Sequence, residues 1–310
     1  MNNIPDDNVL TLIAPTQGGL DDALIAPLTA ALGGLGLDPS PPDWLSGGEA
    51  CDITFAGPDL ETAKEAVQAA LRGAPVDFSI QKADGRRKKI LIADMDSTIV
   101  TSETLDELAA LAGKGPEIAA ITKRSMLGEI DFTGAIHERV AMLTGLAVTV
   151  FDETLAGVNL SPGAEVLVRT MTANGAYTAL VSGGFENFTG PVAAMAGFDE
   201  HRSNRFEVDD GRLTGRVFEP VLGPEDKRNT LVQLSSERGI PMSRTLAIGD
   251  GANDVPMIRS AGLGIAYRGK PIARETALGL GNGTSGACID HTDLTAALFM
   301  QGYRRSDFVT

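Results

Sequence analysis

The stretch ILIADMDSTIV, residues 90–100, decides the fold, because four apolar residues lead directly into two aspartates, Asp94 and Asp96. A short apolar run of this kind is typical of a buried strand. Side chains two residues apart on an extended segment point the same way, so the two carboxylates are expected to share one small volume. Two negative groups held together favour a cation or a proton between them. The pattern therefore predicts chemistry at the end of this strand.

The composition of the 310 residues bounds the class of protein. The apolar fraction of 43% can supply a full core. A net charge of −15 excludes a nucleic-acid surface, and we interpret the one basic cluster, residues 86–89, as a solvated linker. Cys51 and Cys288 have no paired spacing, which favours a reducing compartment. With neither a signal peptide nor an apolar membrane span in the sequence, we predict a cytoplasmic protein without a membrane partner.

Residues 1–82 have the pattern of a separate N-terminal module. Strand-like and helix-like patches follow one another as β, α, β, β, α, β, which is typical of a ferredoxin-like α+β fold. Prolines 39, 41 and 42 interrupt the second strand, expected over residues 37–45. The module resembles ACT-type domains, and we interpret it as a packing or dimerisation domain, which is compatible with a homodimer. Binding of a regulatory amino acid is the alternative that the sequence leaves open.

Residues 83–310 have a different pattern, in which strands alternate with helices after a polar linker at 83–89. This alternation predicts an α/β fold, a doubly wound parallel sheet covered by helices on both faces. The helical block at about 102–158 is too long for a simple crossover between strands, so we expect a helical cap inserted after the first strand of the sheet. Asp210 and Gly211 predict a tight hairpin with a structural role.

Four polar clusters follow strands or begin helices in this second part. They comprise Asp94, Asp96, Ser97 and Thr98; Ser182, Gly183 and Gly184; Lys227; and Asp250, Asn253 and Asp254. Because parallel strands end at one edge of their sheet, we expect the four clusters to converge there.

The combined side chains are those that Mg²⁺-assisted phosphoryl transfer needs. Asp94 and Asp250 can supply carboxylates to a magnesium ion, which prefers oxygen ligands. Lys227, the Ser182 hydroxyl and the Gly183 amide can surround a phosphate. The clusters contain no histidine, so zinc is a poor candidate. The histidines elsewhere follow no ligand spacing, and the glycines at 278–284 lack the context of a nucleotide loop.

The motifs DMDST, SGG, the separated Lys227 and GDGAND together resemble the haloacid dehalogenase (HAD) superfamily in order and spacing over residues 90–255. More narrowly, the cap resembles that of the L-phosphoserine phosphatase family. Glu103 lies nine residues after Asp94, and Met126, Phe132 and Arg139 stand at that family's intervals. Residues 293–303 also resemble the tail of bacterial members, so the resemblance covers residues 85–303.

The resemblance implies a role for each motif residue. Asp94 is the expected nucleophile, which forms an aspartyl-phosphate, and Asp96 the general acid and base, which lends only its backbone carbonyl to Mg²⁺. Asp250 is expected as the second carboxylate ligand of the metal, with Asp254 orienting the site from behind it. Asn253 is expected to donate a hydrogen bond to the phosphate, as are Lys227, Ser182 and the Gly183 amide.

The cap residues imply the substrate. Glu103 is expected to bind an ammonium and Arg139 a carboxylate, while Met126 and Phe132 close the pocket. The implied reaction is hydrolysis of O-phospho-L-serine to L-serine and phosphate, the last step of serine biosynthesis. One alternative is a relative that acts on another small phosphate such as phosphohomoserine, or that passes the phosphoryl group to an acceptor alcohol. The alternative of another class is a catalytically silent, amino-acid-binding regulator.

Overall fold

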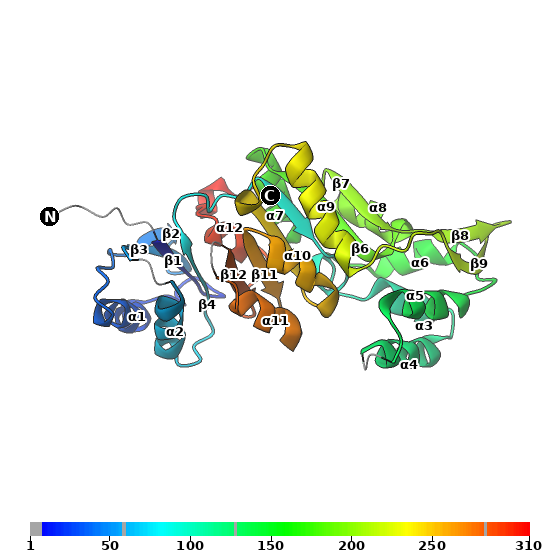
Figure 1. The fold of residues 1–310 in the computed structure, drawn as a ribbon, viewed down its shortest axis with the longest axis horizontal. Coiled ribbons are helices and arrows are strands. Elements are labelled where there is room, and N and C mark those ends of the chain that lie inside the picture. The colour runs from blue at the N-terminus through cyan, green and yellow to red at the C-terminus, as the bar shows by residue number, and fades with distance from the viewer. Residues whose placement is uncertain (1–7, 58–59, 127–128, 282–283) are drawn as a thin grey trace.

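A computed structural model describes residues 8–57, 60–126, 129–281 and 284–310. In Figure 1 the N-terminal module lies at one end of the long axis, the helices α3 to α5 lie at the other end, and the parallel sheet lies between them. Among the described residues, every helix is too short or too polar to cross a membrane.

The N-terminal module is a four-stranded antiparallel sheet of order β2-β3-β1-β4, with two helices. Its elements are β1 (Asn8–Ile13), α1 (Asp22–Gly34), β2 (Asp43–Ser46), β3 (Ala50–Phe55), α2 (Leu60–Leu71) and β4 (Asp77–Lys82). The second strand begins only at Asp43, after the three prolines, because proline has no N–H to donate to a ladder. The order of elements is the predicted one, while the resemblance to ACT-type domains stays a prediction.

The second part contains a six-stranded parallel sheet of order β12-β11-β10-β5-β6-β7. Its strands are β5 (Ile90–Ala93), β6 (Tyr177–Phe185), β7 (Glu200–Asn204), β10 (Thr245–Gly249), β11 (Leu263–Tyr267) and β12 (Ser285–Ile289). Ile90 and Ile92 pack into one hydrophobic core, while Leu91 and Ala93 pack into another. This alternation buries both faces of the sheet, and the predicted doubly wound fold is confirmed.

Helices pack against the parallel sheet along the rest of the chain. They are α7 (Ala164–Ala173), α8 (Glu186–Ala196), α9 (Pro224–Glu237), α10 (Val255–Ser260), α11 (Pro271–Leu278) and α12 (Ala296–Met300). They occupy the places between strands that the predicted alternation requires, and α8 continues through an internal proline at Pro191.

The cap consists of α3 (Thr104–Leu111), α4 (Gly115–Met126), α5 (Phe132–Ala141) and α6 (Val150–Gly157). A hairpin of β8 (Phe206–Asp209) and β9 (Arg212–Val217) packs beside these helices (Figure 1). Gly145 N donates to Leu213 O at 2.8 Å, and Val148 N donates to Gly211 O at 3.0 Å. The hairpin therefore completes the cap from a distant part of the chain, a role that its local sequence signal does not reveal.

The N-terminal module is joined to the second part by buried polar contacts. Asp77 accepts hydrogen bonds from Asp290 N at 3.0 Å, Thr292 N at 2.9 Å and Thr292 Oγ1 at 2.6 Å. Gln81 Nε2 donates to Met300 O at 2.6 Å. Because Asp77 and Gln81 belong to β4, the edge strand of the module lies against β12 and the C-terminal segment.

Candidate active site

The two aspartates of the opening motif lie beyond the strand rather than within it. Strand β5 ends at Ala93, and residues 95–99 form a tight turn in which Ser97 takes a φ of +55°. The expected strand geometry is therefore wrong, because the backbone turns between the two carboxylates, but the side chains still lie close enough for Asp96 to raise the pKa of Asp94. Asp94 stays anchored to the sheet, since its N–H donates to Ile248 O on β10 at 2.9 Å.

Lys227 is the centre of a buried charge cluster. Its Nζ lies 2.5 Å from Asp94 Oδ1 and 2.7 Å from Asp254 Oδ1, and all three residues are buried. Burial alone would lower the pKa of Lys227, but attraction to Asp254 and Asp94 outweighs it and raises that pKa. Burial raises the pKa of Asp94, with a further contribution from Asp254 and opposition from Lys227. The lysine thus holds two carboxylates together at the ends of β5 and β10.

Asp94, Asp250 and Asp254 form a group that could hold a metal ion, because each offers a carboxylate oxygen and these atoms lie within 4.8 Å of one another. The turn after β10 fixes Asp254, whose Oδ2 accepts from Asp250 N at 3.1 Å and Gly251 N at 3.0 Å. A side chain at Gly249 would meet Asp254 Cγ at 2.3 Å, so the close approach requires glycine. Oxygen-only donors of this kind fit Mg²⁺.

Asp96 makes its hydrogen bond to the expected cap segment and not to Lys227. Its Oδ1 accepts from Thr104 N, in the first turn of α3, at 2.8 Å. Burial, with a smaller contribution from Glu103, raises the pKa of Asp96 to about 7. A carboxyl with such a pKa can both donate and accept a proton near neutral pH.

Glu103 lies near the carboxylate cluster, at the beginning of α3. It accepts from Ser97 Oγ at 2.9 Å. Loss of hydration raises its pKa, the Ser97 hydrogen bond and Lys270 lower it, and Asp250 raises it. Glu103 therefore lies close enough to Asp250 and Lys270 to interact with both electrostatically.

The loop at the end of β6 carries the predicted serine and glycines. Ser182 is buried, and its Oγ accepts from Gly184 N at 2.9 Å. Asn204 fixes the same loop, because its Nδ2 donates to Gly183 O at 2.8 Å and its Oδ1 accepts from Leu222 N at 2.7 Å. Asn204 thereby ties the loop to the segment that precedes α9 and Lys227.

Phe132 brings the cap into contact with this loop. A Cβ built on Gly183 would lie 2.7 Å from Phe132 Cζ, and one on Gly223 would lie 3.7 Å from Phe132 Cδ1. The ring therefore covers both loops, which fits the predicted pocket-closing position. Met126 ends α4, and its side chain lies outside the described part of the structure.

This contact gives a first prediction, for Gly183→Ala. The added methyl must push Phe132 aside, so we expect catalytic efficiency to fall by about tenfold or more while the protein stays folded. Phosphate release and the thermal unfolding midpoint are measured together. Adding Phe132→Leu to Gly183→Ala removes the clash and should restore part of the activity. Equal activities of the single and double variants would contradict the contact as the cause.

Arg139 lies beside the first turn of α3, whose capping residue is Glu103. Its Nη2 donates to Asp106 Oδ1 at 2.7 Å, and its Nε is buried and has no hydrogen-bond partner among the described residues. The structure thus places Arg139 and Glu103 on the same part of the cap. Asn253 is half-buried on the short turn after Gly251, next to Asp254.

The structure adds Lys270, Asn204 and Asp106 to the residues that the sequence analysis named. Lys270 Nζ lies 3.1 Å from Asp250 Oδ2, and its N–H donates to Asp250 O at 2.7 Å. Lys270 and Asn204 each lie at or just after the end of a parallel strand, so the same strand-end rule could have found them. Asp106 gives no such signal, because an acid in a first helical turn is ordinary.

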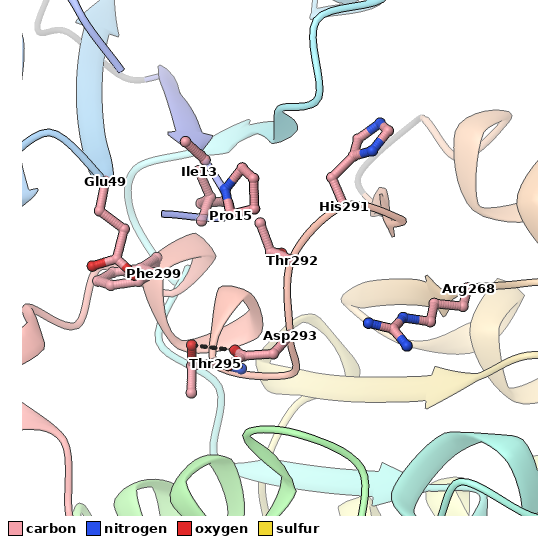
Figure 2. Close-up of a pocket in the computed structure, with 10 residues that line it drawn as sticks. Ile13, Pro15, Glu49, Arg268, His291, Thr292, Asp293, Thr295 and Phe299 are labelled. Atoms are coloured by element: carbon pink, nitrogen blue, oxygen red, sulfur yellow. Dashed lines mark hydrogen bonds between the residues drawn. The ribbon is translucent and has the colours of Figure 1, made fainter. Parts of the chain in front are cut away.

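A cavity of about 210 Å³ lies apart from this cluster, between the N-terminal module and the ends of β11 and β12 (Figure 2). Asp293 in its wall accepts from Thr295 N at 2.8 Å, and Glu49 pairs with Arg305. None of the cluster's carboxylates lines it, so we place the candidate active site at Lys227 instead.

A model of the haloacid dehalogenase-like hydrolases matches residues 91–259, which contain the whole carboxylate cluster. The chain belongs to this family. Its fold also matches the crystal structure of a HAD family hydrolase from Salmonella enterica serovar Typhi, with a TM-score of 0.82 and 28% identity over 96% of this chain and 98% of that one.

Part of the chain is also similar to proteins that are named phosphoserine phosphatases. A phosphoserine phosphatase from Streptococcus thermophilus is 44% identical over 54% of this chain and 78% of its own length. One from Streptomyces coelicolor is 38% identical over 66% of this chain. The chain spans only 51% of that relative, or about half its length. A structure of a phospho-aspartyl intermediate analogue of phosphoserine phosphatase matches with a TM-score of 0.62 and 35% identity over 68% of this chain and 98% of that one.

Proposed function

We propose that this HAD-family chain is a Mg²⁺-dependent phosphatase that hydrolyses O-phospho-L-serine to L-serine and phosphate. The observation that carries the proposal is the buried set of Asp94, Lys227, Asp250 and Asp254, with Glu103 and Arg139 on the adjoining cap. The similar proteins are named phosphoserine phosphatases, which supports phosphoserine as the proposed substrate.

In the proposed reaction, Asp94 attacks the phosphorus atom and forms an aspartyl-phosphate. Lys227 holds the attacking carboxylate in place and balances the charge of the incoming phosphate. Asp96, whose pKa is about 7, starts protonated and gives its proton to the leaving serine oxygen. It then takes a proton from the water that cleaves the aspartyl-phosphate.

Asp94 and Asp250 would hold Mg²⁺, together with the backbone carbonyl of Asp96, and Asp254 would orient them through its bonds to the turn after β10. When bound, the ion keeps carboxylates ionised and polarises the phosphate. The Ser182 hydroxyl, the Gly183 amide and the Asn253 side chain would donate to the phosphate oxygens.

The cap would select the amino acid part of the substrate. Glu103 supplies an anion for the ammonium, and Arg139 supplies a planar cation for the carboxylate. Asp106 holds the guanidinium of Arg139 by one nitrogen, while the buried Nε still lacks an acceptor. An unpaired buried donor is costly, so a carboxylate that reached it would be bound favourably.

Phosphate release from a panel of phosphorylated metabolites tests this function. Phosphoserine should be the best substrate, EDTA should abolish its turnover, and added Mg²⁺ should restore it. Better turnover of phosphohomoserine, or transfer to an acceptor alcohol, would favour the alternative enzymes. If no compound of the panel released phosphate in a metal-dependent way, the result would favour the alternative of a catalytically silent, amino-acid-binding regulator.

For Arg139→Ala we expect a KM for phosphoserine at least about tenfold higher, because a charge-assisted contact to the carboxylate is lost. Activity on an aryl phosphate without a carboxylate should hardly change. Steady-state kinetics on both substrates measure the difference, and Arg124→Ala, on the exposed side of α4, is the matched control. Equal losses on both substrates would contradict the role of Arg139 in recognition.

A further inference from the structure

A second and larger cavity, of about 690 Å³, lies between the N-terminal module and the parallel sheet. Its wall includes Lys88, Arg244, Gly262 and Ser285, which stand just before or at the start of β5, β10, β11 and β12. The candidate active site lies at the opposite, carboxyl ends of the same sheet. A five-residue strand is about 16 Å long, so the cavity is separate from the catalytic cluster.

Lys88 lies in this wall and is buried, so the interpretation of residues 86–89 as a solvated linker is wrong for this residue. Only 5% of the residue is exposed. Its Nζ donates to Ser243 O at 2.9 Å and to Gly85 O at 3.2 Å, and no ion pair with a described carboxylate is formed. An ammonium has three N–H donors, so these two carbonyls leave one donor for a further acceptor.

The charged neighbour of Lys88 is another cation. Burial, with a smaller contribution from Arg244, lowers the pKa of Lys88 to about 8. Within the described part of the chain, the ion pair of Arg244 is a long 3.6 Å contact with Asp84, whose side chain is fully exposed. A buried positive charge beside a second one is costly unless an anion joins them.

Among the described residues that line the wall, basic side chains outnumber acidic ones, although the protein carries a net charge of −15. Its basic residues are Lys64, Lys82, Lys88 and Arg244, and its acidic residues are Glu61 and Asp84. Both acids are exposed, whereas Lys64 and Lys88 are buried. Glu49, which lines the smaller cavity of Figure 2, is by contrast paired with Arg305 outside that lining.

We propose that this cavity is a binding site for a small organic anion, whose carboxylate or phosphate group is held between Lys88 and Arg244. The volume lies within the range of roughly 300–1,000 Å³ that is usual for small-molecule sites. The hydroxyls of Thr284 and Ser285 and the apolar side chains of Ile80 and Leu280 in the same wall suit the remainder of such a ligand.

The test uses the full chain and two probe anions, succinate and sulfate, with neutral succinamide as the matched probe. Binding is measured by calorimetry and by the shift of the thermal unfolding midpoint. We expect saturable binding of at least one anion at millimolar concentration, and none of succinamide. Lys88→Met and Arg244→Gln should each weaken it about tenfold or more, since each removes a charge-assisted hydrogen bond.

Lys89→Gln is the control, because Lys89 is the exposed neighbour of Lys88 and points to Asn174 O instead of the cavity. It should bind the anion as the wild type does. Binding that survives both Lys88→Met and Arg244→Gln would place the anion at the catalytic pocket and overturn the proposal, as would no saturable binding of either anion. If Lys88→Met does not fold, Arg244→Gln, whose side chain is 38% exposed, decides the result.

Discussion

Asp94→Asn is expected to lose phosphoserine turnover by at least about 10⁴-fold, because the neutral amide cannot attack phosphorus. The change keeps the size of the side chain and removes its negative charge. Phosphate release measures the loss. Trapping of the reacting enzyme with labelled substrate and acid measures covalent phosphate on the protein, which we expect on the wild type and not on the variant.

The same variant should remain folded, and this separates chemistry from stability. Lys227 keeps its ion pair with Asp254 at 2.7 Å, so the ammonium stays neutralised. Since burial raises the pKa of Asp94, its charged form is unfavourable there, and an amide should cost little stability. Asp152→Asn, on the exposed face of α6, is the matched control with full activity expected. More than a tenth of wild-type turnover in Asp94→Asn would contradict the nucleophile assignment.

The fold could be predicted from the sequence because its signals are local. The apolar run before Asp94 and the alternation of strands with helices depend on neighbouring residues, and both lead to the observed sheet. The hairpin that completes the cap could not be predicted in that role. Its bonds to Gly145 and Val148 join segments about 65 residues apart, and no local pattern encodes such a contact.

The arrangement of the candidate site could be predicted in part. For Asp94 and Asp96 the expected extended strand differs from the turn that the structure shows. The strand-end rule brought Asp94, Lys227 and Asp254 together correctly as a group of neighbours. The sequence analysis gave Asp94 and Asp96 unequal roles only through the family resemblance, and the structure adds the environments: Asp94 pairs with Lys227, while Asp96 accepts a hydrogen bond from Thr104 N at the start of α3. The positive φ of Ser97, directly after Asp96, belongs to a turn that no local sequence pattern had predicted.

Lys227→Met has the largest expected effect on stability, because the variant leaves Asp94 and Asp254 buried without their cation. Breaking a buried ion pair by removing one partner costs about 3–5 kcal/mol. We also expect turnover to fall by about 10²–10³-fold, since the cation that balances the phosphate is lost. Chemical and thermal unfolding measure the first effect, and phosphate release the second. Methionine nearly preserves the length of the side chain, so the change is mainly one of charge.

Mg²⁺ should distinguish an electrostatic cause from a packing defect in this variant. A divalent cation bound by Asp94 and Asp250 would supply part of the missing positive charge, so Mg²⁺ should stabilise Lys227→Met more than it stabilises the wild type. Lys270→Met is the matched control, because this 49% exposed lysine contacts Asp250 from the solvent side and should contribute about 1 kcal/mol or less. If both variants lost the same stability, or if Mg²⁺ stabilised Lys227→Met no more than the wild type, Lys227 would not be the charge that holds the two buried carboxylates together.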